Sequence, residues 1–200
     1  MTVNKVGRPS KARERIAEIL RATATVVARD GLANTTLSQV AAAAGMQRTL
    51  VLHYFGSRDS LIQAFVDEAV AAYGTAMLRV DNDEKLLRRI HTMFAPGAYH
   101  SREDLVVWSE LVALGARDPH VRQRLHALWA RRWLPELEQQ LADQYPSASP
   151  DEISSAAYGL ACLFEAHWAF HLQGITGPDR QRQAQHSAQA ILDSLTTTAP

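Results

Sequence analysis

Apolar residues recur along most of this chain at steps of three and four positions, a spacing that places them on one face of an α-helix. The first such series predicts a helix from about Ser10 to Asp30, which Gly31 then ends. Its apolar face consists of Ile16, Leu20, Ala24 and Val27. No stretch shows the strict alternation of apolar and polar residues that is typical of strands. The pattern therefore predicts an all-α chain of about nine helices.

Two short helices are predicted between residues 36 and 55. Thr36, followed three positions later by Gln39, fits a capping box that satisfies the first amide groups of a helix. Gly45 is a suitable break, because glycine adopts positive φ without a steric penalty. A second helix follows from about Gln47 to Tyr54. This arrangement fits a helix-turn-helix, whose second helix enters the DNA major groove, but the spacing alone also fits an αα-corner of an ordinary helical protein.

The rest of the chain continues the helical pattern. A long helix is predicted over residues 57–80, with Ser57 as its N-cap, and it would connect the first 56 residues to the remainder. Pro135 lies inside a later helical series and should kink or split it. The other predicted helices cover residues 81–94, 101–116, 119–141, 150–172 and 184–195.

Charge is balanced over the whole chain, with 21 basic and 21 acidic side chains, but it is unevenly distributed. Residues 1–60 hold nine basic and four acidic side chains, a net charge of +5, so the remaining 140 residues carry −5. A basic N-terminal third on an acidic body is typical of a protein that presents one end to a polyanion. Lys5, Arg8 and Lys11 could reach phosphates or a minor groove, or could belong to a solvated arm.

Composition argues against several other classes of protein. Cys162 is the single cysteine, which excludes an internal disulfide and a cysteine metal cluster and is compatible with a reducing cytoplasm. The longest apolar stretch, residues 156–172, is interrupted by a glutamate and two histidines, so burial within protein explains it better than a bilayer. The first ten residues lack the apolar region of a signal peptide. We therefore expect a cytoplasmic protein without a membrane partner.

The order of these elements resembles the tetracycline-repressor (TetR) family of transcriptional regulators. The resemblance extends from about residue 10 to residue 61, roughly a quarter of the chain, and is specific in combination. The residues that carry it are Ala22–Gly31, Thr36–Ala41, Ala44-Gly45, His53-Tyr54-Phe55 and Arg58. It implies a domain over residues 1–56 that contains the arm and the helix-turn-helix, and a ligand-sensing and dimerisation domain over residues 57–200.

The resemblance also implies which residues contact DNA. They are Thr36, Gln47, Arg48, Thr49, His53, Tyr54 and Arg58. We expect Arg48 and Thr49 to contact base edges. Thr36, Tyr54 and Arg58 are expected to contact phosphates, and His53 could serve either way. The sequence departs from the family pattern at Leu50-Val51-Leu52, where a hydroxyl and an aromatic residue are usual, and at Gln47, where serine is usual. Leu50 or Leu52 could instead touch a thymine methyl group.

The apolar stretch 156–172 needs a second surface to cover it, so we expect a homodimer through the last two helices. Two heads in such a dimer would face successive major grooves of a palindromic operator, about 34–36 Å apart. The family resemblance implies that a small molecule binds the body, moves the connecting helix 57–80 and lowers operator affinity. Repression rather than activation follows from this analogy alone.

Aromatic residues and one acid are the candidates for the effector pocket. They are Tyr73, Phe94, Trp108, Glu110, Trp129, Trp133 and Trp168, with Met93 beside them. An anionic Glu110 among aromatic rings would suit a cationic or quaternary ammonium ligand, and the body resembles the subgroup that contains the choline-responsive betaine repressor. The tryptophans could equally be core residues, and the glutamate could pair with an arginine.

Two other functions remain open from the residues themselves. His167 and His171 have the i, i+4 spacing of metal ligands, but no third ligand stands in a recognisable motif. We therefore expect no enzyme, no catalytic residue, no metal and no cofactor. The alternative to a DNA-binding regulator is a helical protein-interaction module whose basic head binds an acidic partner.

Overall fold

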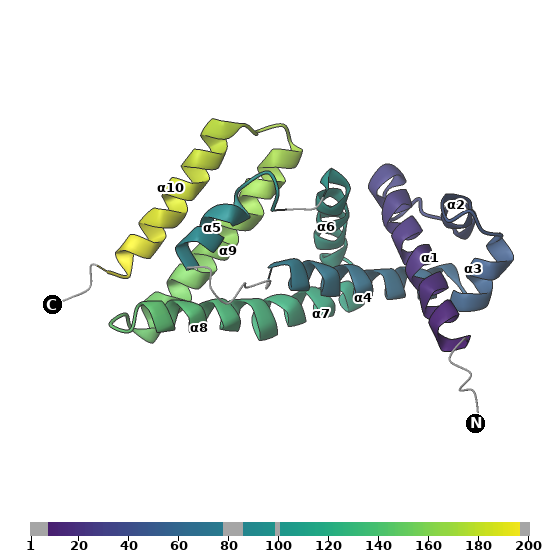
Figure 1. Cartoon of the computed structure of the whole chain (residues 1–200), viewed down its shortest axis with the longest axis horizontal. Coiled ribbons are helices and arrows are strands. Elements are labelled where there is room, and N and C mark those ends of the chain that lie inside the picture. The colour runs from purple at the N-terminus through teal and green to yellow at the C-terminus, as the bar shows by residue number, and fades with distance from the viewer. Residues whose placement is uncertain (1–7, 78–85, 99–100, 197–200) are drawn as a thin grey trace, which may run out of the picture.

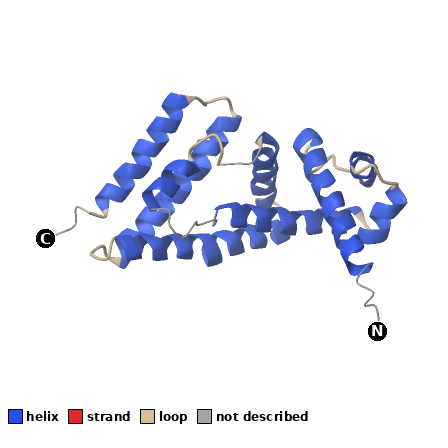
Figure 2. Ribbon diagram, viewed as in Figure 1, coloured by secondary structure: helices blue, strands red, loops and turns tan. Residues whose placement is uncertain are grey.

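A computed structural model of the chain describes residues 8–77, 86–98 and 101–196. Within these residues the protein consists of helices, turns and loops, without a strand (Figure 2). The helices are α1 (Arg8–Asp30), α2 (Leu37–Ala43), α3 (Arg48–Phe55), α4 (Arg58–Met77), α5 (Leu86–Met93), α6 (Arg102–Gly115), α7 (Pro119–Leu128), the π-helical turn η1 (Trp129–Trp133), α8 (Leu134–Gln144), α9 (Pro150–Leu172) and α10 (Pro178–Ser194). Because α7, η1 and α8 are continuous, the described helices number nine, which confirms the predicted all-α class.

The molecule is elongated, with α1–α3 at one end and α9 and α10 at the other (Figure 1). We call α1–α3 the head and the remaining helices the body. The head has its own apolar core, in which Ile19, Val26, Val40, Val51 and Leu61 are fully buried. The first four come from the three head helices, while the last comes from the first turn of α4. The head core therefore includes the start of the helix that leads into the body.

Local sequence explains how the head helices begin and end. The predicted capping box is present, with Thr36 Oγ1 accepting from Gln39 N and Gln39 Oε1 accepting from Thr36 N. Gly45 and Gly56 have φ of +63° and +74°, a region that other residues rarely adopt. Ser57 accepts from the amide of Ser60 and so caps α4, as predicted.

A second apolar cluster joins the head to the body. Its buried members come from α1 and the turn after it, from α4, from α6 and from α7. They include Val27, Leu32, Phe65, Val66, Val70, Trp108, Leu111, Val121 and Leu128. Asp67 of α4 adds an ion pair to Arg124 of α7 at 2.6 Å. The head is therefore packed against α4 and α6 rather than attached by a linker.

The third and largest cluster fills the far part of the body, between α5, α8, α9 and α10. The chain enters it through η1, where Leu134 N donates to Trp129 O, five residues back. Pro135 lacks an amide donor for the next α-helical bond, which accounts for a widened turn just before it. The predicted break at this proline is confirmed, but its form as a π-helical turn was not predicted.

Some sequence predictions fall outside the described residues. These are Lys5 of the N-terminal arm, the last residues of the predicted helix 57–80 and the predicted helix start at residues 81–83. The helix predicted to end near Phe94 is described only as α5.

Candidate nucleic-acid interface and adjoining cleft

Helix α3 presents its first turn to solvent. Gln47, Arg48 and Thr49 are all exposed, whereas Val51 is completely buried and anchors the helix to the head core. Gln47 occupies the N-cap position with φ −78° and ψ 143°, but its side chain makes no capping bond. Three polar side chains at the exposed N-terminus of the second helix are the arrangement by which a helix-turn-helix reads base edges.

The other predicted DNA contacts on the head differ in their surroundings. His53 is exposed and packs edge-on against half-buried Tyr54, with ring centroids 5.4 Å apart. Leu52 keeps 37% of its surface exposed, while Leu50 is half-buried. Thr36 is exposed, and its hydroxyl lies 2.6 Å from Gln39 Oε1 as part of the capping box. Contact of any of these residues with DNA stays a prediction.

Arg58 lies across the turn between α1 and α2. Its Nε donates to Thr35 O at 2.7 Å, and one terminal nitrogen donates to Leu32 O at 2.9 Å and Ala33 O at 3.2 Å. Charge-assisted bonds to three carbonyls hold this turn, residues 31–35, against the start of α4. Sequence reasoning assigned this arginine only to phosphate, because backbone carbonyls more than twenty positions away leave no pattern in the sequence.

Glu110 holds the same turn from the body side. Its Oε2 accepts from Leu32 N at 3.1 Å, and a Cβ added at Gly31 would lie 3.7 Å from that oxygen. The structure therefore places this carboxylate at the junction of head and body, away from the aromatic residues with which the sequence grouped it. The turn 31–35 is bonded to α4 on one side and to α6 on the other.

A different acid lies among the aromatic rings. Tyr73 and Trp108 stack face to face, with centroids 3.5 Å apart and planes inclined by 4°. Glu165 of α9 accepts from both, from Tyr73 Oη at 2.8 Å and from Trp108 Nε1 at 3.0 Å. Burial raises the pKa of Glu165 above its ordinary value, although the two hydrogen bonds oppose that shift. The pocket residues predicted from the sequence did not include this glutamate, and it is not among the residues that line the cleft described below.

The remaining predicted pocket aromatics are buried in the body core. The ring centroid of Trp129 lies 6.4 Å from that of Trp108 and 5.0 Å from that of Trp133. Phe94 packs on Phe164 at 6.2 Å, and Trp168 donates from Nε1 to Met93 O at 3.0 Å. The alternative that most of these rings are structural therefore has direct support in their packing.

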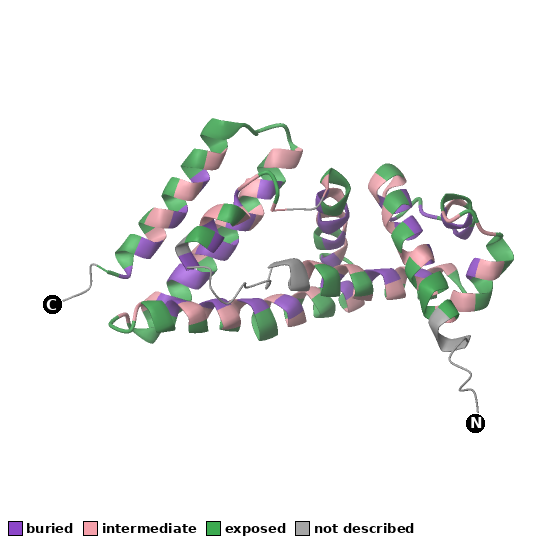
Figure 3. Cartoon of the chain, in the orientation of Figure 1, coloured by how far each residue is buried: buried purple, intermediate pink, exposed green. Residues whose placement is uncertain are grey.

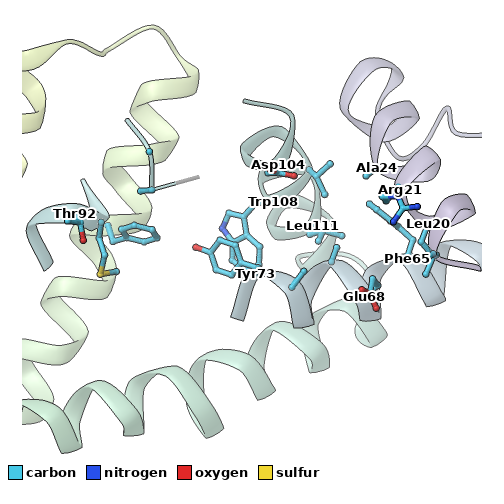
Figure 4. A pocket seen from close by; sticks show the side chains of 18 of the residues that line it. Leu20, Arg21, Ala24, Phe65, Glu68, Tyr73, Thr92, Asp104, Trp108 and Leu111 are labelled. Atoms are coloured by element: carbon cyan, nitrogen blue, oxygen red, sulfur yellow. The ribbon is translucent and has the colours of Figure 1, made fainter. Parts of the chain in front are cut away.

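A cleft of about 990 Å³ lies between α1, α4, α6 and the end of α5 (Figure 4). Of the predicted pocket residues, Tyr73 and Trp108 line it, and so does Met93. Phe94, Trp129, Trp133, Trp168 and Glu110 are not among its lining residues. The cleft also extends along α1, so helices of the head and the body form its walls together.

The two histidines of α9 do not form part of a larger ligand cluster. His171 Nδ1 lies 2.9 Å from Thr176 Oγ1, and burial together with nearby His171 lowers the pKa of His167. Within the described residues no group of three or more histidine, cysteine, aspartate or glutamate side chains could hold a metal ion. Among the same residues, no helix combines the length and apolar character needed to cross a bilayer.

Helix α9 has one buried face and one exposed apolar face. The buried face includes Leu160, Phe164 and Trp168. On the exposed face Tyr158 and Phe170 keep 65% and 50% of their surfaces accessible, and Cys162, between them in the sequence, is exposed as well. Exposed and buried segments alternate along α9 (Figure 3). A solvent-exposed apolar stripe on the end helix is typical of a surface that another subunit covers.

The head has the features of a DNA-binding helix-turn-helix: an exposed start of α3, a glycine turn before it and a capping box at α2. Comparison with known proteins agrees: residues 19–65 match the family model described as bacterial regulatory proteins of the tetR family. The chain is 28% identical over 188 residues to the HTH-type transcriptional regulator BetI of Burkholderia thailandensis, covering 90% of this chain and 93% of that protein.

Solved structures share the whole fold. A protein of Pseudomonas aeruginosa PAO1 superposes with a TM-score of 0.76 at 18% identity and covers 98% of each chain. A protein of Saccharomonospora viridis in complex with choline superposes with a TM-score of 0.72 at 17% identity, covering 93% of this chain and 97% of that one.

The chain thus carries the DNA-binding segment of the tetR family at residues 19–65 and is similar over most of its length to transcriptional regulators of BetI type. These relatives are named as transcriptional regulators, in agreement with the expectation that the chain is not an enzyme.

Proposed function

We propose that this protein is a repressor that binds a palindromic operator as a homodimer and is released when a small quaternary ammonium compound binds its body. The observation that carries the proposal is the Tyr73–Trp108–Glu165 group, which places a carboxylate against stacked rings beside the cleft. Aromatic faces and a desolvated carboxylate attract a cation that carries no hydrogen-bond donors. We keep the division into a DNA-binding domain, residues 1–56, and a sensing domain, residues 57–200.

DNA recognition is proposed for the exposed side of the head. Arg48 and Thr49 would contact base edges, because they stand at the exposed N-terminus of α3. Gln47 and His53 are exposed on the same helix and could contribute to either class of contact. Thr36 and Tyr54 are proposed for phosphates, where they would fix the register of the head without reading sequence.

For Arg58, the bonds to the turn 31–35 favour a positioning role over the expected phosphate contact. Both roles can be tested separately, because only a phosphate contact changes the salt dependence of binding.

The exposed stripe of α9 supports dimerisation through α9 and α10. Tyr158 and Phe170 would be covered by the same helices of a second subunit in a two-fold arrangement. Small residues between them, such as Ala166 and Cys162, would let the helices approach closely. Two heads linked in this way would present two copies of α3 to half-sites about one helical turn apart.

The effector class rests on chemistry and on similarity. Glu165 supplies one carboxylate, and Tyr73 and Trp108 supply ring surface at the cleft. The similar protein of Saccharomonospora viridis is in complex with choline, a quaternary ammonium compound, and the curated relative is named BetI. These likenesses support the effector class and leave the particular compound open.

A route from the pocket to the head runs along α4 and α6. Tyr73 belongs to α4, whose first residue is Arg58, while Trp108 belongs to α6 and lies two residues before Glu110. A cation that separates the two rings would displace these helices, and each helix holds the turn 31–35 at its other contact. A ligand changes operator affinity in this way only if it binds the displaced form more tightly.

The direct experiment selects duplexes from a random pool with the purified protein and then adds choline or tetramethylammonium to the selected complex. We expect a palindrome with half-sites about 34–36 Å apart, and release of the protein by the cation. Glu165→Gln should keep operator binding and lose most of the response. Enrichment of no palindrome at low salt would refute the operator proposal, and a complex indifferent to every quaternary ammonium compound would refute the effector class.

A further inference from the structure

The cleft extends from α5 to α1. Its part away from α1, which we call the aromatic end, is lined by Tyr73, Trp108 and Phe164 and also by Thr92 and Met93 of α5 (Figure 4). Between this part and α1 lie apolar side chains of α4 and α6, such as Phe65 and Leu111. Its outer part reaches α1, where Ile16 and Leu20 form the wall (Figure 4). The volume of about 990 Å³ lies at the upper limit of the range, about 300–1,000 Å³, that is typical of pockets for drug-sized ligands. A choline-sized molecule at the aromatic end would leave most of this space unfilled.

Alanine residues keep the outer part of the cleft open. The lining alanines of its α1 and α4 walls are Ala17, Ala24, Ala69 and Ala72. Between them stand larger apolar side chains, including Phe65 and Leu20. Because alanine side chains take up less space than larger apolar ones, they leave room between Tyr73 and α1, where most but not all of the lining side chains are apolar.

Charge is distributed unevenly along the cleft. The acid Asp104 lies near Trp108, while Arg21 lies near Leu20 and Phe65 at the α1 end (Figure 4). Arg13 of α1 and Glu68 of α4 line the cleft as well. Arg89 lines the aromatic end, where one of its terminal nitrogens donates to Gln140 at 2.7 Å. Two arginines thus line the α1 end, whereas Asp104 offsets Arg89 at the aromatic end, so a cationic group meets less repulsion at the aromatic end.

We propose that the effector is an elongated cationic amphiphile, with a quaternary ammonium head at Tyr73 and Trp108, the two rings that bond Glu165, and an alkyl chain that extends along Phe65 to Ile16 and Leu20 of α1. This inference rests on the proposed function and names the class of effector within it. The aromatic end supplies attraction for the head, and the rest of the cleft supplies apolar surface for the chain.

The alkyl chain of the effector has a role that its ammonium group lacks. The ammonium group touches only the body, whereas the end of the chain touches α1, a helix of the DNA-binding head. A ligand shifts an equilibrium only through contacts that differ between the two states, so contact with α1 adds to the coupling that the ring pair provides through α4 and α6. Long ammonium compounds should therefore release the operator more completely than short ones, which act through the ring pair alone.

A series of trimethylammonium salts with methyl, butyl, octyl and decyl substituents tests this inference below their micelle concentrations. Affinity for the DNA-free protein is measured by calorimetry, and operator release is measured by fluorescence anisotropy. Each buried methylene should tighten binding about fourfold, until the chain reaches the hydrated mouth at Arg13 and Arg21. Octanesulfonate, which has the same chain and an anionic head, should bind far more weakly than the octyl ammonium salt.

Two matched variants test where the alkyl chain of the effector binds. Ala72→Leu narrows the cleft at an exposed position of α4 next to Tyr73, so it should reduce the gain from butyl to octyl by more than it reduces tetramethylammonium affinity. Ala142→Leu makes the same change at an exposed position of α8 outside the cleft and should retain the full gain. Both variants should bind the operator without ligand.

The outcomes separate the two proposals. If tetramethylammonium binds and releases the operator but longer chains give no gain, the elongated effector is refuted and the proposed function stands. If octanesulfonate binds as tightly as the ammonium salt, or Ala72→Leu retains the gain, the assigned orientation is refuted. If no quaternary ammonium compound binds, the effector class fails and this inference fails with it.

Discussion

The DNA-binding head and the effector cleft are built in different ways from the same chain. Apart from Thr36, the residues proposed for DNA contact lie within a single short segment, residues 47–54, which is held in place by a buried residue of its own helix, Val51. The cleft is lined by residues from five helices, of which α1 belongs to the head itself. A contact on the head can therefore be changed alone, whereas a change in the cleft also affects how the head is held.

The two regions meet at the turn 31–35, where Glu110 and Arg58 make complementary bonds. Glu110 accepts from a backbone amide of the turn, and Arg58 donates to three of its carbonyls. Because each side chain comes from a helix that also lines the cleft, this turn is the structural element through which both regions can influence each other.

The largest expected effect is on the head. Replacing Arg48 by alanine removes the long basic side chain at the start of α3 and should weaken specific operator binding by about 1–3 kcal/mol. Effector affinity of the DNA-free protein should not change, because the residue is exposed and distant from the cleft lining. Arg131→Ala, at an exposed position of η1, is the matched control and should bind the operator normally. Equal losses in both variants would contradict base readout by α3.

An effect of similar size, on stability rather than on DNA binding, is expected at the junction. Glu110→Ala leaves the partly buried Leu32 amide without its acceptor, which should cost about 1–3 kcal/mol in the free energy of unfolding. Glu110→Gln keeps an oxygen acceptor at the same place and should recover most of that loss. Urea unfolding measures the stability of both variants, and cation-induced operator release measures their coupling. Equal stability and equal response in the alanine and glutamine variants would show that this bond has no role.

Arg58→Lys sharpens the distinction between positioning and phosphate contact. Lysine retains the charge but cannot reproduce the guanidinium bonds to Thr35 and Leu32, so operator affinity should fall. The slope of log affinity against log salt should be the same for Arg58→Ala as for the wild type, because no phosphate contact is lost. A slope reduced by about one in the alanine variant, with full activity of the lysine variant, would instead favour a phosphate contact.

The smallest expected effect is the pH dependence that Glu165 adds to stability. Burial raises the pKa of this carboxyl above its ordinary value of 4.5, so between the two values the folded state binds more protons than the unfolded state. The free energy of unfolding should therefore fall as pH rises from 4.5 through the raised pKa. His167 acts in the opposite direction, because burial lowers its pKa.

The difference between wild type and Glu165→Gln isolates the contribution of the carboxyl. Unfolding in urea is measured for both proteins across a pH series. Between pH 4.5 and the raised pKa of Glu165, the wild type should lose stability that Glu165→Gln does not lose. A bound quaternary ammonium ion should favour the ionised carboxylate and lower its pKa, so cation affinity should rise with pH over the same interval. A cation affinity that does not change with pH would argue against Glu165 as the partner of the head group.

Patterns within the sequence determined the helices of the head and the class of the protein. Thr36 with Gln39, Gly45 and Ser57 act on neighbours within a few residues, so their roles could be read without a structure and are observed as predicted. The same reasoning predicted a break at Pro135, since a missing amide acts locally, although the helix resolves it as a π-helical turn.

Only the tertiary structure decided which acid contacts the aromatic residues Tyr73 and Trp108. Glu110 and Glu165 both stand in apolar helical stretches, and sequence context favoured the first. The fold directs Glu110 to Leu32, 78 positions away, and brings Glu165 to Tyr73 and Trp108, 92 and 57 positions away. Such pairings depend on how helices rotate and pack against one another, and short-range spacing carries no record of that geometry.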